Sequence, residues 1–137
     1  MADPQIIREW LDKADEDFDF AESVLEDSSF YAQICFHFHQ AVEKYLKAFI
    51  VGNDLDFRKI HDLQVLLKSC ITKNKTLESL IIDCKLLNGF YIDTRYPVHW
   101  PTNYTLETAK EAKDAASNIQ EKIKAALKPI ISSSQTT

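Results

Sequence analysis

Apolar residues recur along most of the chain at alternating spacings of three and four, the repeat of one face of an α-helix. Over residues 3–27 they form one continuous stripe, while Asp and Glu crowd the remaining positions. Asp3 is expected to cap this first helix, with Pro4 at the first helical position. The stripe consists of Ile7, Leu11, Ala14, Phe18, Ala21 and Leu25.

A second helix is predicted to start at Ser28 or Ser29 and to end at Gly52. A polar loop over 53–62 follows, and then a short helix from about 61 to 72. The second stripe consists of Ile34, Phe38, Ala41, Tyr45 and Phe49.

Two further helices complete the pattern. Thr76 can cap the first of them, and Pro97 disfavours helix at the residue before it, so this helix should end near Thr94 or Arg95. Thr105 can cap a last long helix. Its stripe is made mostly of small residues, which permit close packing: Ala109, Ala112, Ala116, Ile119, Ile123 and Leu127.

The pattern predicts an all-α fold, an up-and-down antiparallel bundle of four to five helices. With 137 residues, two glycines and four prolines, the chain has too few turn residues for an all-β domain. We expect one domain over residues 1–130 and a flexible tail over 131–137, since the sequence shows no internal repeat.

The net charge and the cysteine content limit which partners and which cellular compartment the sequence predicts. The net charge of −5 is a weak attractant for nucleic acid, so any nucleotide site must be a local cluster. The three cysteines have no metal or redox spacing, which favours buried free thiols in a reducing cytoplasm. We expect no signal peptide and no membrane segment, since no apolar run approaches about 20 residues.

The histidines do not predict a metal site. His37 and His39 are two apart, and on a helix such residues point about 200° apart and cannot share one ion. His39 precedes Glu43 by four residues, a spacing suited to an ordinary surface hydrogen bond. The roles of His37, His39 and His61 stay open, and no cofactor motif is present.

Polar residues form a strip on the second helix. Glu43 and Lys47 have the spacing of a surface ion pair, and Lys44 lies beside them. From spacing alone this strip is typical of a solvated helix face. The functional alternative is that its two ammonium groups hold a phosphate.

The segment "YIDTRYPVHW", residues 91–100, allows two interpretations. The aromatic rings can close the end of the core, with Arg95 stabilised at a helix C-terminus. Alternatively, Arg95 grips a phosphate, Tyr91 and Tyr96 stack on a base, and His99 moves a proton. Spacing alone favours the structural interpretation.

Three motifs in order, "CFHFHQAVEKYLKAFI", "HDL" at 61–63 and "YIDTRYP", together with the first-helix pattern, resemble the HEPN family, the higher-eukaryote and prokaryote nucleotide-binding domains. The resemblance runs from about residue 6 to 127. It implies a helical bundle, often a homodimer with its site near the dimer cleft. Many small members accompany a minimal nucleotidyltransferase in a toxin–antitoxin pair.

The resemblance implies two functions. As a nucleotide-binding or interaction module, the favoured and non-catalytic interpretation, the chain would use Lys44, Lys47, Tyr91, Arg95 and Tyr96. As a metal-independent ribonuclease it would use Arg95 and His99. These two are separated by three residues, where the ribonuclease members have four to six.

Overall fold

The computed structural model describes residues 2–95 and 104–133 of the chain. These residues form five α-helices and one 3₁₀ helix. Their bounds are α1 Pro4–Val24, α2 Tyr31–Gly52, α3 Leu63–Lys73, η1 Lys75–Leu80, α4 Ile81–Arg95 and α5 Leu106–Ser133.

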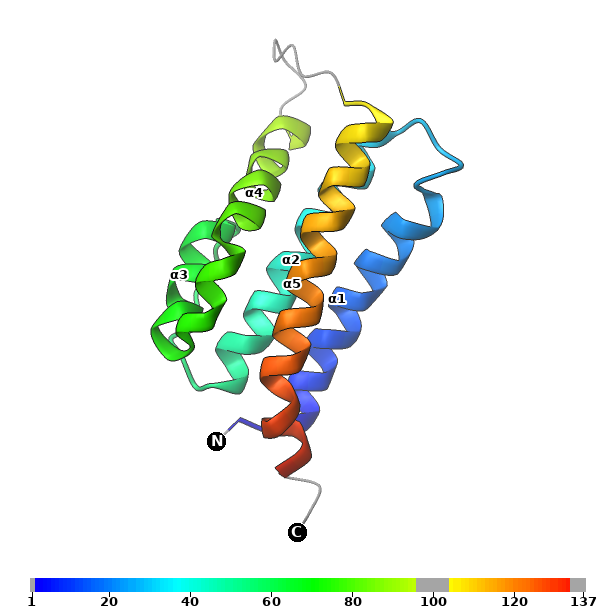
Figure 1. Cartoon of the computed structure of the whole chain (residues 1–137). Helices are drawn as coiled ribbons and strands as arrows, with labels where there is room; N and C mark the ends of the chain where they lie inside the picture. Colours follow the sequence, from blue (N-terminus) through cyan, green and yellow to red (C-terminus); the bar gives the residue numbers. More distant parts are fainter. Residues whose placement is uncertain (1, 96–103, 134–137) are drawn as a thin grey trace.

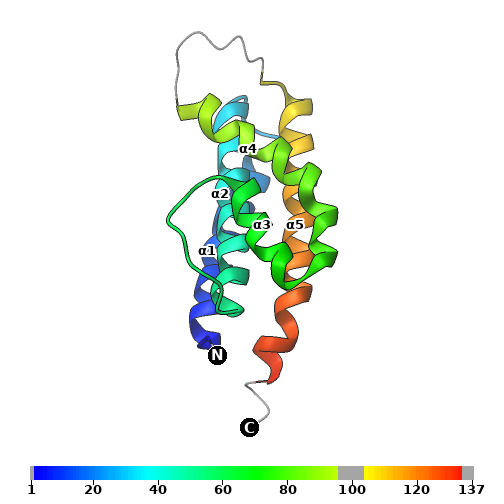
Figure 2. The ribbon, with the colours of Figure 1, turned by 90° about the vertical axis from the view of Figure 1, so that its left-hand side faces the viewer.

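The helices make an antiparallel bundle (Figure 1), which confirms the predicted fold class. In that view α1 and α4 run upward, while α2, α3 and α5 run downward. The connection between α2 and α3 leaves the lower end of the bundle and climbs back along its outer side before α3 begins (Figure 2). This path brings residues 53–62 back alongside the middle of the molecule.

α2 is the central helix and packs against α1, α3, α4 and α5. Most of its residues are buried, whereas α1 and α5 bury one stripe each. The predicted stripes of α1, α2 and α5 lie in this core, with Leu11 partly buried beside it. The fully buried large side chains include Ile7, Ile34, Phe38, Tyr45, Leu46 and Phe49.

Several predicted helix ends are confirmed. The Asp3 carboxylate accepts the backbone N–H of Gln5 at 2.9 Å. The Thr105 hydroxyl accepts the N–H of Thr108 at 3.1 Å, and α4 ends at Arg95.

Two predicted helix starts were wrong. α2 begins at Tyr31 rather than at a serine, because Ser28 uses its hydroxyl to accept the N–H of Phe30 in the turn before the helix. Asn74, not Thr76, caps the segment before α4, and the capped element is the 3₁₀ helix η1. The Thr76 hydroxyl instead donates to Asn74.

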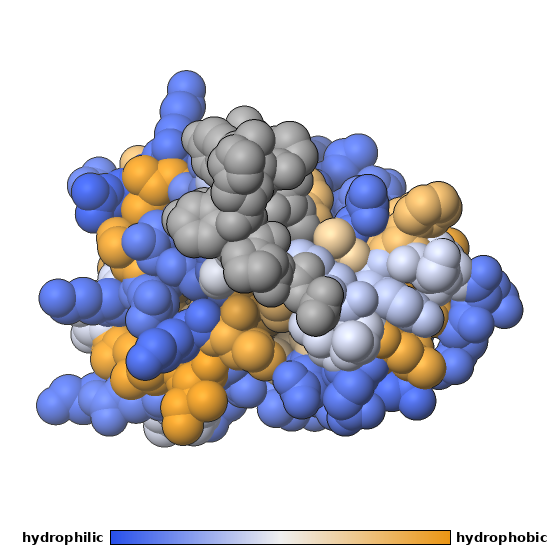
Figure 3. Space-filling view, turned by 90° about the horizontal axis from the view of Figure 1, so that it is seen from above, coloured by the Kyte–Doolittle hydropathy of each residue, from blue (hydrophilic) through white to orange (hydrophobic). Residues whose placement is uncertain are grey.

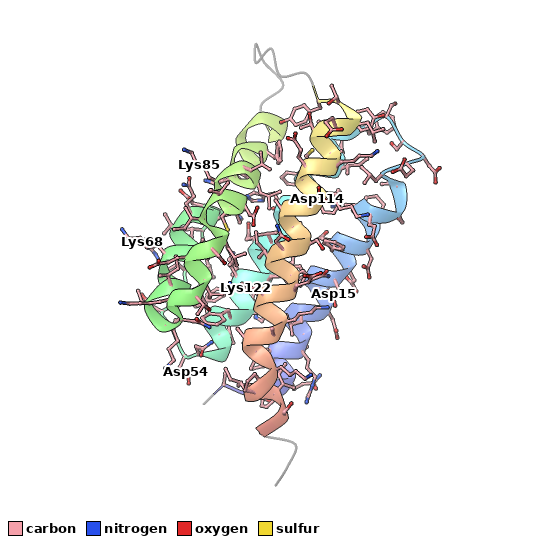
Figure 4. All side chains as sticks on the ribbon, in the orientation of Figure 1. Asp15, Asp54, Lys68, Lys85, Asp114 and Lys122 are labelled. Atoms are coloured by element: carbon pink, nitrogen blue, oxygen red, sulfur yellow. The ribbon has the colours of Figure 1, made fainter. Side chains whose placement is uncertain are left out.

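A polar cluster joins α1, α2 and α5. The Asp15 carboxylate accepts hydrogen bonds from the Tyr45 hydroxyl, from Gln120 at 3.2 Å and from Lys124 at 2.9 Å. Figure 4 shows Asp15 on the side of α1 that faces α5. Burial alone would raise the pKa of Asp15, but the bonds from Tyr45, Lys124 and Gln120 lower it below its usual value.

The three cysteines are free and buried, one each in α2, α3 and α4. Burial raises the pKa of Cys35 and that of Cys70 to about 12, and it raises the pKa of Cys84 as well. Within the described part of the chain, no helix combines the length and the apolar character needed to cross a membrane.

Candidate functional site

A buried ion pair on α2 is the centre of the candidate site. Lys47 Nζ donates to Glu43 Oε2 at 2.9 Å, so the predicted pair is confirmed. The pair does not lie on a solvated face, however, because each residue is only 6% exposed. A charge removed from water needs a close partner and further hydrogen bonds, so this pair depends on what surrounds it.

The connection between α2 and α3 covers the pair. Phe57 lies in this connection, and its ring centroid is 5.8 Å from Lys47 Nζ. The same ring lies 5.7 Å from that of Trp10 on α1. The returning chain therefore shields a lysine that its helical spacing alone would leave in water.

His61 supplies the second hydrogen bond to the carboxylate. Its Nδ1 lies 2.8 Å from Glu43 Oε1, and since a carboxylate only accepts, Nδ1 carries the hydrogen. The side chain of His61 is 49% exposed. The histidine thus joins a buried carboxylate to the surface.

The start of α3 holds the backbone next to His61. The Asp62 carboxylate caps this helix by accepting the N–H groups of Gln64 and Val65. Asn88 of α4 accepts the N–H of Leu63 at 2.8 Å and donates to Asp62 at 3.1 Å. Asp62 is thus a helix cap that also ties α3 to α4.

His39 fixes the same backbone from the side of α2. It is fully buried, and its Nε2 donates to the carbonyl of His61 at 3.2 Å while its Nδ1 lies 3.2 Å from Gln40 Oε1. The expected hydrogen bond from His39 to Glu43 is therefore wrong, because Glu43 is engaged by Lys47 and His61. Burial lowers the pKa of His39, so the ring is neutral near neutral pH.

Tyr91, the first residue of the "YIDTRYP" segment, lies beside His61 and His39. Its ring centroid lies 4.9 Å from that of His61, with the planes 19° apart. It also lies 5.2 Å from His39 and 6.2 Å from Phe36. Arg95 ends α4 about one turn after Tyr91. Of the predicted site residues, Tyr96 and His99 lie outside the described residues.

Lys44 lies on a different side of α2 from Lys47. Its ammonium group is paired with Asp17 of α1, which is also 3.3 Å from His37 Nδ1. The structure therefore brings Lys47 and Tyr91 to one cluster through Glu43 and His61, and it places Lys44 with α1.

In this arrangement His61 is a half-exposed group that can carry a positive charge or transfer a proton. It is hydrogen-bonded to the carboxylate of Glu43, whose charge is neutralised by a lysine. Lys47 offsets the charge of Glu43, and the His61 side chain that donates to Glu43 is half exposed. Among the described residues, His, Cys, Asp and Glu side chains form no group of three or more that could hold a metal ion. The groups available here suit an anion or a proton transfer.

Sequence reasoning did not link Glu43 to His61. The two are 18 residues apart, and only the returning connection brings them together. One signal was present: residues 36, 39, 43 and 47 recur at helical spacing, so the polar residues lie on the same face of the helix as Phe36.

Comparisons with known proteins agree on one family. A family model described as the HEPN domain matches residues 7–126. The solved structure of TT1696 from Thermus thermophilus is 30% identical, with a TM-score of 0.78, covering 87% of this chain and 96% of that one. No curated protein matches the chain.

A second solved structure, ST0689, is described as an archaeal HEPN homologue. It is 22% identical to this chain, with a TM-score of 0.73, and the match covers 88% of this chain and 97% of that one. At this identity the likeness concerns the fold. The family model covers most of the bundle, including α2, the start of α3 and all of α4. The chain therefore belongs to the HEPN domain family.

Proposed function

We propose that this protein is a nucleotide-binding module that acts as a homodimer together with a nucleotidyltransferase protein. The observation that carries the proposal is the cluster of Glu43, Lys47, His61 and Tyr91 next to the helix end that bears Arg95. On an acidic chain, such a local group of cationic and aromatic side chains is where a nucleotide phosphate would be held.

The roles within the site follow from burial. Lys47 is buried and paired, so it acts by neutralising Glu43 rather than by touching the ligand. In this proposal Arg95 grips phosphate by two donors, and Tyr91 and Tyr96 provide the aromatic surface near the base. Lys44 is paired with Asp17 and is not among the residues proposed to contact the nucleotide.

Calorimetric titration with ATP tests the binding. Wild type is expected to release or absorb heat on binding, and Arg95→Ala is expected to weaken binding by about tenfold, the value of one charge-assisted contact. Arg8→Ala is the matched control, since Arg8 lies on α1 beside Lys124 and Lys128 at another surface. Equal affinity in all three proteins would exclude Arg95 as a phosphate ligand.

The homodimer is supported by an exposed apolar stripe on α4. Ile82 is 80% exposed, Leu86 follows one turn later at 39%, and Gly89 continues the same face. Sedimentation velocity is expected to show a dimer that Ile82→Glu dissociates. Phe30→Glu, at an exposed phenylalanine beyond α1, should leave the dimer intact.

The nucleotidyltransferase partner is tested by co-expression. The gene neighbouring this one is the first candidate if it encodes such an enzyme. A complex that survives gel filtration supports the proposal, and separate elution at high concentration contradicts it.

A metal-independent ribonuclease is the second candidate. It is favoured by the half-exposed, carboxylate-bound His61 near the helix end that bears Arg95, since an acid–base group and an arginine suit RNA cleavage. RNA cleavage without metal should then be lost in Arg95→Ala and His99→Ala, the predicted pair, and in His61→Ala. The same trace of cleavage in wild type and in all three variants would contradict the ribonuclease and favour the binding module.

A further inference from the structure

The ring of His61 is held from three directions. Nδ1 donates to Glu43 at 2.8 Å, the backbone carbonyl accepts from His39 at 3.2 Å, and one face lies 4.9 Å from the ring of Tyr91. None of these contacts engages the second ring nitrogen, Nε2, which has no hydrogen bond to any described residue. The half-exposed side chain of His61 is thus held in place, and its Nε2 can still donate or accept a hydrogen bond.

The charges around the ring favour an anion at Nε2. Glu43 is already neutralised by Lys47, so a protonated His61 would add a positive charge beside the pair. The Asp62 carboxylate is occupied by the first turn of α3. Among the described residues, the titratable groups that contact His61 are Glu43 and His39 on α2 and Tyr91 on α4. Lys47 is paired with Glu43, and Asp62 follows His61 in the chain.

We propose that His61 is a phosphate ligand of the nucleotide site and that Glu43 is its positioning residue. This inference rests on the proposed nucleotide binding and assigns a contact within it. As an imidazolium, His61 donates Nε2–H to a phosphate oxygen while Nδ1–H stays on Glu43.

The histidine on the opposite side of α2 provides a matched control. His37 is also paired with a carboxylate, that of Asp17, at 3.3 Å, and its side chain is also partly exposed. It contacts Phe20 and Phe36 rather than Tyr91, and it lies beside an apolar hollow lined by Phe20, Val24 and Phe30. A general effect of removing a surface histidine would appear equally at both positions.

The experiment is calorimetric titration of the whole chain with ATP, and with adenosine as a probe without phosphate. Wild type, His61→Asn and His37→Asn are compared at one and the same pH, because ATP itself takes up a proton near neutrality. The asparagine amide can reach Glu43 but supplies no nitrogen at the Nε2 position.

We expect His61→Asn to bind ATP about tenfold more weakly than wild type, the value of one charge-assisted hydrogen bond. His37→Asn should follow wild type, and adenosine binding should be alike in all three. Glu43→Gln should weaken ATP binding and leave adenosine binding unchanged, as a positioning role requires.

If His61→Asn keeps the affinity of wild type for ATP, the inference is wrong and nucleotide binding stands. If wild type does not bind ATP, both the proposed function and this inference fail. Thermal unfolding checks that each variant folds. Should His61→Asn not fold, His61→Ala answers the same question, because it removes both ring nitrogens.

Discussion

At Glu43 one carboxylate takes a hydrogen bond on each oxygen, from Lys47 on one and from His61 on the other. The ion pair with Lys47 was predictable from the spacing of four, but its burial was not. Burial depends on a connection that begins six residues after Lys47 and folds back over it. Helical periodicity describes only the helix itself, so a polar residue covered by a distant loop looks like a solvated one.

Removing Lys47 should destabilise the fold more than removing Lys44. Lys47→Ala leaves a buried carboxylate without its cation, which costs about 3–5 kcal/mol. Lys44→Ala breaks a more exposed pair with Asp17, which costs about 1 kcal/mol. Urea unfolding of the two variants measures the difference, and equal midpoints would contradict the buried role of Lys47.

At the scale of single elements, the helices were largely predictable. The stripes of α1, α2 and α5 and the end of α4 before Pro97 follow from spacing and from the steric effect of proline. The start of α2 and the 3₁₀ segment η1 were not predictable, because several serines, threonines and asparagines compete for each capping position. The choice between them depends on the turn that the bundle imposes.

The two glycines should respond differently to alanine. At Gly89 an added Cβ meets nothing within 4 Å, so Gly89→Ala should stabilise α4 by up to about 1 kcal/mol. At Gly52 the Cβ would lie 2.9 Å from Leu127 Cδ2 and 3.2 Å from Ile7 Cδ1, so the core must shift.

Thermal unfolding measures both changes. We expect a higher melting temperature for Gly89→Ala and no increase for Gly52→Ala. A gain of the same size at both positions would mean that the contact of Gly52 with α1 and α5 is looser than the structure shows.

At the scale of the whole molecule, polar clusters tie the helices together across the apolar core. The Asp15 cluster joins α1, α2 and α5, whereas Lys122 donates to Ser79 at 2.7 Å and joins α5 to η1 (Figure 4).

On the outer surface, Lys68 and Lys85 extend from α3 and α4 away from the bundle. Figure 3 shows, from above, apolar side chains at the surface between polar ones. Phe20 and Phe30 are among the large apolar side chains that are exposed.

Asp15→Asn should lower the stability of the whole bundle in a pH-dependent way. The pKa of Asp15 in the folded protein lies below its value in the unfolded chain. As the pH falls, the Asp15 carboxylate is therefore protonated at a higher pH in the unfolded chain than in the folded protein. The stabilisation by Asp15 is therefore complete above the unfolded pKa of about 3.9 and is lost as the pH falls through the folded pKa.

Urea unfolding at neutral and at acidic pH measures this effect. The gap between wild type and Asp15→Asn should be largest near neutrality and should close on acidification. Asp114→Asn, the same change at another position on the bundle, in α5, is the control and should match wild type throughout.

The buried cysteines can report when separate parts of the bundle open. A thiol with a raised pKa and no access to solvent reacts with an alkylating reagent only when its surroundings open. Cys35, Cys70 and Cys84 lie in three different helices, so their labelling rates time the opening of α2, α3 and α4 separately. If the bundle opens only as a whole, the three rates will be limited by one event. If α3 and α4 part from the central helix first, Cys70 and Cys84 will be labelled while Cys35 is still protected.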